Sequence, residues 1–161
     1  QCLAAGSDLR GVDELMYHRI LVPLENTRTD RVILAHVSAL ARQCGASVVL
    51  VHVADGFAAR NLQQLDLRES EEMRRDRQYL DDMCAQLTAE GLACEAVLAC
   101  GNPADEIAAA AAREEADLIA MATHGHRGIN DLLRGSVASE LRHRTLIPVL
   151  MVREPQAKSA P

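Results

Sequence analysis

The chain has 161 residues, of which 48% are hydrophobic, and this length suits one domain with a sizeable core. Its formal net charge is −6 and no basic block stands out, so neither a nucleic acid nor an anionic membrane surface is an expected partner. No apolar run approaches the ~20 residues of a membrane span. Aromatic residues make up only 2%, which favours an aliphatic core such as a parallel sheet covered by Ala-rich helices.

The cysteines form no recognisable framework. There are five, an odd number, and no two have C-x-x-C spacing. Scattered thiols of this kind are typical of a reducing compartment, so we predict a cytoplasmic protein. We interpret them as small buried hydrophobic residues rather than redox groups. They are Cys2, Cys44, Cys84, Cys94 and Cys100.

The first 15 residues differ in character from the rest of the chain. Gly6-Ser7, Val12-Asp13 and Glu14-Leu15 are dipeptides that common cloning sites encode in frame, and Met16 is typical of a native start. We therefore predict that residues 1–15 derive from a vector. The domain is then expected to comprise residues 16–153, followed by a flexible tail over residues 154–161.

Five short apolar runs, most of them rich in β-branched residues, predict strands buried on both faces. The first run ends at Pro23, which lacks an N–H for the sheet, and a polar turn with several N-cap candidates follows it. In chain order the predicted strands are residues 19–24, 47–53, 93–99, 118–121 and 148–152.

Between these strands lie four stretches that predict helices, three of them by the spacing of their apolar residues and their end signals. Gly45 and Gly91 follow the first two, as glycines that end helices do. Asn102 and Pro103 suit the N-cap and first position of the third, and Ser136 is expected to open the fourth. In chain order the predicted helices are residues 33–44, 69–90, 103–115 and 136–144.

This alternation of strands and helices predicts an α/β fold: an open five-stranded parallel sheet of order 3-2-1-4-5 with right-handed crossovers and helices on both faces. Such a fold is Rossmann-like. In open parallel sheets, ligands bind beyond the carboxyl ends of the strands where the winding reverses. That point lies here between the first and fourth strands, next to Pro23-Leu24-Glu25 and the segment 121–125.

Small residues continue from that point to the start of the last predicted helix. Gly125, Gly128 and Gly135 allow a backbone to approach phosphates closely, and Ser136 can cap the helix or donate to a phosphate oxygen. The N–H groups at a helix start favour an anion. The same glycines also suit ordinary turns, and His124, His126 and Arg127 also suit a solvated loop.

Residues 16–153 resemble the universal stress protein family. The resemblance rests on Ile20-Leu21-Val22-Pro23, Val51-His52-Val53, Gly101-Asn102-Pro103 and Pro148-Val149-Leu150-Met151-Val152. The ATP-binding branch of that family is similar to G-x-x-G-x9-G-[ST]. In this chain Ala122 stands at the first glycine, Gly125 at the second, and Gly135-Ser136 follow after nine residues. Glu25 stands where ATP-binding members typically have Asp.

The resemblance implies that the Rossmann-like fold is of the adenine nucleotide alpha hydrolase-like type. It also implies an ATP site, with Mg²⁺ or Mn²⁺ held by the phosphates rather than by protein side chains alone. The family's first, second and fourth strand ends contact adenine and ribose, and its last loop and helix start hold the phosphates. Arg127 is a further candidate that compensates phosphate charge. The implied nucleotide-binding residues are Pro23, Leu24, Glu25, Val53, Met121, Ala122, His124, Gly125, His126, Gly135, Ser136, Val137 and Ala138.

The last strand is expected at the edge of the sheet, where bare apolar strands invite pairing. We predict a two-fold homodimer through antiparallel pairing of Val149, Leu150, Met151 and Val152, as the resemblance also implies. The expected function is an ATP-binding regulatory module of the stress response with an unidentified protein partner. Two alternatives remain open: a nucleotide-free dimeric interaction protein and a slow ATPase. No nucleophile–base pair and no G-x4-G-K-[ST] motif stands out, so no catalytic residue is assigned. His36 and His52 are interpreted as packed histidines rather than ligands.

Overall fold

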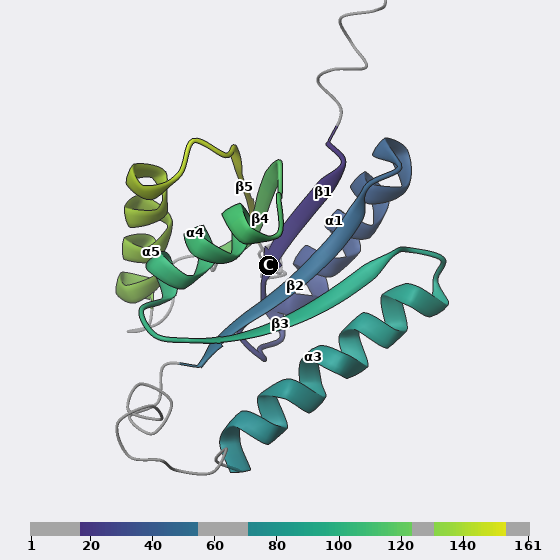
Figure 1. Ribbon diagram of the computed structural model, residues 1–161, viewed down its shortest axis with the longest axis horizontal. Helices are drawn as coiled ribbons and strands as arrows, with labels where there is room; N and C mark the ends of the chain where they lie inside the picture. Colours follow the sequence, from purple (N-terminus) through teal and green to yellow (C-terminus); the bar gives the residue numbers. More distant parts are fainter. Residues whose placement is uncertain (1–16, 55–70, 124–130, 154–161) are drawn as a thin grey trace, which may run out of the picture.

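The computed structural model describes residues 17–54, 71–123 and 131–153. Strands and helices alternate along these segments, as the sequence predicts (Figure 1). The elements are β1 (Arg19–Pro23), α1 (Thr29–Cys44), β2 (Ser47–Ala54), α3 (Glu71–Ala89), β3 (Cys94–Cys100), α4 (Pro103–Arg113), β4 (Leu118–Thr123), α5 (Asp131–Arg144) and β5 (Val149–Arg153).

The strands form one five-stranded parallel sheet of order β3-β2-β1-β4-β5, which confirms the predicted fold class. In the register, Leu21 of the central strand β1 lies beside Val49 of β2 and Ile119 of β4. From β1 the chain passes to β2 and β3 on one side of β1, whereas β4 and β5 lie on the other side. The direction in which strands are added to the sheet therefore reverses between β1 and β4.

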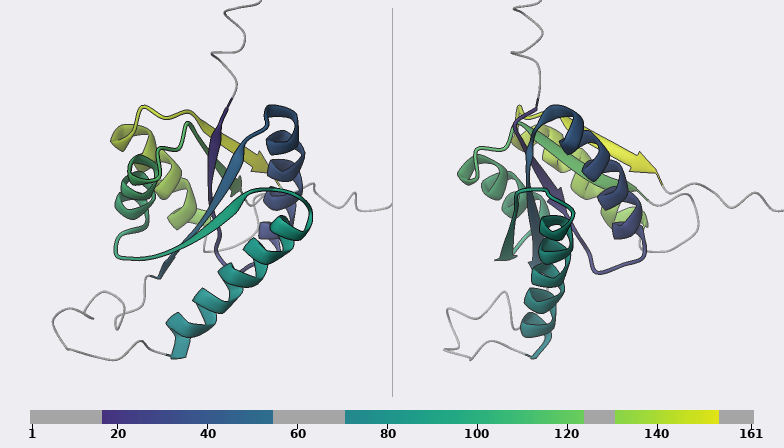
Figure 2. Two further views of the ribbon diagram at one scale, coloured as in Figure 1. Left: turned by 45° about the vertical axis from the view of Figure 1, so that its right-hand side comes forward. Right: turned by 90° about the vertical axis from the view of Figure 1, so that its right-hand side faces the viewer.

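Helices cover both faces of this sheet, with α1 and α3 on one face and α4 and α5 on the other (Figures 1 and 2). Successive side chains of a strand point to opposite faces, so each strand serves both layers. In β1, Ile20 and Val22 pack with α1 and α3, whereas Leu21 packs with α4 and α5. All three side chains are fully buried, which explains why the strands are continuous apolar runs.

The ends of two helices follow the predicted signals. Gly45 after α1 has φ of 68°, a left-handed conformation that a residue without Cβ adopts readily. The Asn102 side chain accepts a hydrogen bond of 3.2 Å from Asp105 N, and Pro103 occupies the first turn of α4. Both helices therefore start or stop where local chemistry favours it.

The predicted start of the last helix is wrong. Helix α5 begins at Asp131 rather than at Ser136, so Gly135 and Ser136 lie inside the helix. Residues 131–134 are compatible with a helix, and one interior Gly costs only about 1 kcal/mol relative to Ala. Strand β4 also extends to Thr123, two residues beyond the predicted end.

Within the described segments, none of the helices combines the length and the apolar character that crossing a membrane requires.

Candidate functional site

A cavity of about 380 Å³ lies at the carboxyl ends of β1, β2 and β4. Its size is within the range of roughly 300–1,000 Å³ that small-molecule sites occupy. The location is the reversal of winding between β1 and β4, where the sequence predicts a site. The cavity is lined by Pro23, Leu24, Glu25, Thr29, Asp30, Val51, His52, Val53, Pro103, Ile107, Met121, Ala122 and Val137.

Most of this lining is apolar, and the apolar part comes from three strand ends and from the helices α4 and α5. Val51 and Val53 share one face of β2, Met121 ends the buried part of β4, and Ile107 and Val137 close the cavity from α4 and α5. An apolar lining with a few placed polar groups is typical of a site that takes a flat, partly hydrophobic ligand.

The β1–α1 loop is held by the buried carboxylate of Asp30. This side chain, whose residue is only 2% exposed, accepts hydrogen bonds from Glu25 N at 3.2 Å, Thr27 N at 3.2 Å and Tyr79 Oη at 2.7 Å. Asp30 lies in the first turn of α1, where a negative charge is favoured by the helix dipole. Burial, followed by the hydrogen bond to Asp30, raises the pKa of Tyr79, so its hydroxyl keeps the proton that it donates. Three donors from two elements therefore fix one wall of the cavity.

His52 of β2 joins the same wall to α3. Its Nδ1 lies 2.8 Å from Leu24 O, and its Nε2 lies 3.4 Å from Asp76 Oδ2. The Leu24 N–H donates to Val51 O at 2.8 Å, so both backbone polar groups of Leu24 are engaged. His52 is thus a hydrogen-bonded, largely buried histidine, as the sequence predicts, and it also lines the cavity, which the sequence did not predict.

The charged groups of the lining are acidic. Asp30 accepts hydrogen bonds from three donors of the protein, and Glu25 is exposed at the mouth of the cavity. None of the described lining residues is Lys or Arg. Two helices, α1 and α4, begin beside the cavity, and their first turns add partial positive charge there. In the described parts of the chain, no group of three or more His, Cys, Asp or Glu side chains is arranged to hold a metal ion.

The structure brings together seven of the residues predicted from the sequence. These lining residues are Pro23, Leu24, Glu25, Val53, Met121, Ala122 and Val137. Gly135 and Ser136 lie in α5, and Ala138 is buried in the hydrophobic cluster beneath that helix rather than in the lining. The predicted residues His124, Gly125, His126 and Arg127 lie outside the described residues.

Six lining residues were not predicted. Val51 could have been found, because it lies two residues before Val53 and so on the same face of β2. Pro103 could also have been found, because a helix that follows a strand of a parallel sheet begins at the carboxyl edge. The contributions of Thr29, Asp30, His52 and Ile107 depend on tertiary packing and carry no comparable local signal.

Ala122, which stands at the first glycine of the family pattern, occupies the end of β4. It is not among the described residues with positive φ. Because a negative φ accommodates a Cβ without strain, the methyl group is compatible with this backbone.

The doubly wound sheet and the cavity at its switch point define an open α/β domain of the nucleotide-binding type. Comparison with known proteins refines this class. The model of the universal stress protein family matches residues 16–153, and the chain belongs to that family.

Individual relatives agree with this assignment. Universal stress protein MJ0577 of Methanocaldococcus jannaschii is 25% identical over 159 residues, which cover 86% of this chain and 96% of the relative. The solved structure of MJ0577 superposes with a TM-score of 0.73 and covers 88% of this chain and 99% of that one.

Two more distant structures share the fold and contain nucleotides. The universal stress protein of Archaeoglobus fulgidus in complex with dAMP is 23% identical with a TM-score of 0.61, covering 84% of this chain and 98% of that one. A universal stress protein in complex with cAMP is 18% identical with a TM-score of 0.62, covering 85% of this chain and 97% of that one.

Proposed function

We propose that this chain binds an adenine nucleotide, ATP with Mg²⁺ or Mn²⁺, in the cavity between β1 and β4 and acts as a homodimeric regulatory module. The observation that carries the proposal is the apolar cavity at the switch point, with one wall held rigid by Asp30. Further support comes from the structures of universal stress proteins in complex with dAMP and cAMP.

The adenine is assigned to the apolar part of the lining. Val53, Met121 and Val137 offer aliphatic surface from three different elements, which suits the faces of a planar base. Because both backbone polar groups of Leu24 are already hydrogen-bonded, Leu24 contributes packing rather than hydrogen bonds to the base. This part of the site is therefore expected to recognise the flat shape of the adenine more than the hydrogen-bonding groups on its edge.

The ribose is assigned to the mouth of the cavity, next to Glu25. The N–H of Glu25 is held by Asp30, so the exposed Glu25 carboxylate starts from a fixed backbone position. A carboxylate at this place can accept hydrogen bonds from ribose hydroxyls. The same carboxylate would supply one oxygen ligand to Mg²⁺ or Mn²⁺, which the phosphates mainly hold.

The phosphates are assigned to the segment with His124, Gly125, His126 and Arg127, which lies outside the described residues, and to the backbone of Gly135 and Ser136. Inside α5 the N–H of Gly135 is directed toward the carbonyl four residues earlier, so it is not available to an anion. Phosphate binding by this amide therefore requires the first turn of α5, residues 131–134, to open. We expect hydrogen exchange in residues 135–138 to change on addition of ATP but not of adenosine.

The test is to denature freshly purified protein, chromatograph any released nucleotide, and titrate emptied protein with ATP in a calorimeter. Val53→Phe should fill the cavity and abolish the titration heat. Val97→Phe is the matched control, because Val97 is a half-buried valine of the same hydrophobic cluster that does not line the cavity. If neither nucleotide nor heat is found with wild type, the nucleotide-free interaction protein becomes the better description. If Val53→Phe binds as well as wild type, the cavity is not the site.

The homodimer is assigned to the free edge of β5. This strand ends the sheet, and Met151 is 50% exposed. Met151→Glu should place like charges near one another across a two-fold strand pair and shift the protein to monomer in light scattering. Ala109→Glu, an exposed substitution on α4, should leave the dimer intact. Dimers that persist in Met151→Glu would refute pairing through β5.

A further inference from the structure

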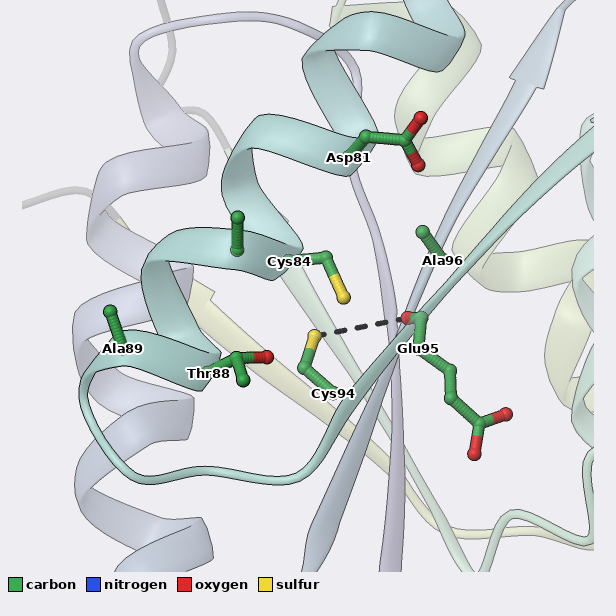
Figure 3. A pocket seen from close by; sticks show the side chains of 8 residues that line it. Asp81, Cys84, Thr88, Ala89, Cys94, Glu95 and Ala96 are labelled. Atoms are coloured by element: carbon green, nitrogen blue, oxygen red, sulfur yellow. Dashed lines mark hydrogen bonds between the residues drawn. The ribbon is translucent and has the colours of Figure 1, made fainter.

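The outer edge of the sheet carries a pair of cysteines away from the nucleotide cavity. Strand β3 ends the sheet on this side, and the last turns of α3 pack against its first residues (Figure 1). A shallow, open hollow lies between them. Figure 3 shows the side chains that line it: Asp81, Cys84, Ala85, Thr88, Ala89, Cys94, Glu95 and Ala96.

The thiols of Cys84 and Cys94 point toward one another in this hollow (Figure 3). Cys94 Sγ also lies 3.8 Å from Glu95 O. Both cysteines are half-buried and are reduced in the structure. A disulfide needs two side chains that are directed at each other, and the Cys84 and Cys94 side chains have this orientation (Figure 3).

The pairing of these side chains follows from the packing of α3. Leu80 and Leu87 are almost fully buried against the sheet, at 1% and 3% exposure. Cys84 lies between them on the same stripe of the helix and therefore faces β3. Buried Leu92 then anchors the connection to β3, which begins at Cys94. Apolar contacts on both sides thus hold the two sulfurs together.

We propose that Cys84 and Cys94 are a redox modification site, which a hydroperoxide converts reversibly to a disulfide linking α3 to β3. The proposal does not rest on nucleotide binding. In a reducing compartment such a bond is transient and is restored to the dithiol by small thiols.

The reaction balances in two steps. In the first, the Cys84 thiolate attacks one peroxide oxygen, the O–O bond breaks, and a sulfenic acid forms while water or an alcohol leaves. In the second, the Cys94 sulfur attacks the Cys84 sulfur, the S–O bond breaks, and the hydroxide leaves as water with the Cys94 proton. The two thiols together lose two electrons and two protons, and the hydroperoxide gains them.

The surroundings indicate which sulfur reacts first. Burial, followed by contact with the Cys84 thiol, raises the pKa of Cys94, and the neighbouring Glu95 acts in the same direction. A thiol that keeps its proton suits the resolving step, so Cys94 is assigned to that step and the attack on the peroxide to its partner.

The test is to treat the full, reduced chain with hydrogen peroxide, block remaining thiols, and map the cysteines by mass spectrometry. The expected product has lost two hydrogen atoms, carries a Cys84–Cys94 link, and returns to the dithiol with dithiothreitol. Because the link closes a loop of about ten residues, the oxidised protein should melt roughly 5–10 °C higher than the reduced protein.

Control variants separate this pair from the other thiols. Cys84→Ser and Cys94→Ala should each abolish the link and the rise in melting temperature. Cys44→Ser, which changes a half-buried cysteine packed against the same hydrophobic cluster, should leave both unchanged. The proposal would be overturned if the wild-type protein instead acquired separate sulfinic acids, or if either residue became linked to another cysteine. This result comes from the wild-type protein, so it holds even if a variant fails to fold.

Discussion

Carboxylates at the two ends of the sheet bind different kinds of partner. At the amino end, Asp117 accepts hydrogen bonds from His18 N at 2.7 Å and Arg19 N at 3.0 Å, which joins the start of β1 to the residue before β4. The Arg19 guanidinium pairs with Glu95 and Glu114, and the hydrogen bond with Glu95 raises the pKa of Arg19. At the carboxyl end, Asp30 binds its own loop and Tyr79 instead.

This difference shows how the strands of one sheet can be joined by side chains at the amino end while a cavity lies at the carboxyl end. At the amino end, Asp117 joins the residue before β4 directly to the start of the neighbouring strand β1. At the carboxyl end the polar partners of Asp30 lie in the loop and in α3, so the lining of the cavity stays mainly apolar. The following substitutions test whether the two carboxylates have these separate roles.

Asp30→Ala is expected to have the largest effect. It leaves Glu25 N, Thr27 N and the Tyr79 hydroxyl without their acceptor in a buried place, so we expect a loss of about 3 kcal/mol in the free energy of unfolding. Urea denaturation measures this loss, and nucleotide affinity should fall as well. Asp30→Asn keeps the shape but not the charge and should lose less. Unchanged stability in Asp30→Ala would show that the loop is held by other contacts.

Asp117→Ala is expected to have an intermediate effect. It removes the acceptor of two backbone N–H groups, but the Asp117 side chain is 38% exposed, so water can replace part of the interaction. We expect a loss of about 1.5 kcal/mol in urea denaturation with no change in nucleotide affinity. Weakened nucleotide binding in this variant would mean that the two ends of the sheet are not independent.

Tyr79→Phe is expected to have the smallest effect, about 1 kcal/mol, because it removes one donor of Asp30. The effect should depend on pH. The folded protein holds the Tyr79 proton more tightly than the unfolded chain, so the contribution is complete below about pH 10, the usual pKa of Tyr, and declines as the pH rises above that value. Denaturation of both proteins from pH 8 to 11 should show the difference shrinking. A constant difference would assign the effect to packing alone.

The fold and much of the cavity could be predicted from the sequence because they depend on local patterns. Continuous apolar runs separated by amphipathic stretches predict a parallel sheet, and the parallel sheet places the ends of β1, β2 and β4 at one edge. Pro23 and Met121 follow from that placement alone, whereas Val53 is predicted from the family resemblance.

The remaining features depend on contacts between distant residues. Asp30 is one of several polar residues after β1, and its partner Tyr79 is 49 residues away, so no local pattern distinguishes it. The start of α5 is a different case: residues 132–134 are good helix formers, but the predicted start lies at Ser136 because Ser is a common N-cap residue. The apolar stripe of α3 directs Cys84 toward the sheet, but its meeting with Cys94 depends on how α3 packs along β3.

The most direct test of the central claim is methyl NMR of the protein during titration with ATP and Mg²⁺. We predict that the largest shifts occur at Leu24, Val53, Met121 and Val137, around the cavity. Methyl groups near the amino end, such as those of Ile20 and Leu118, should shift little. Saturable shifts centred on the amino end, or none at the cavity, would contradict the account.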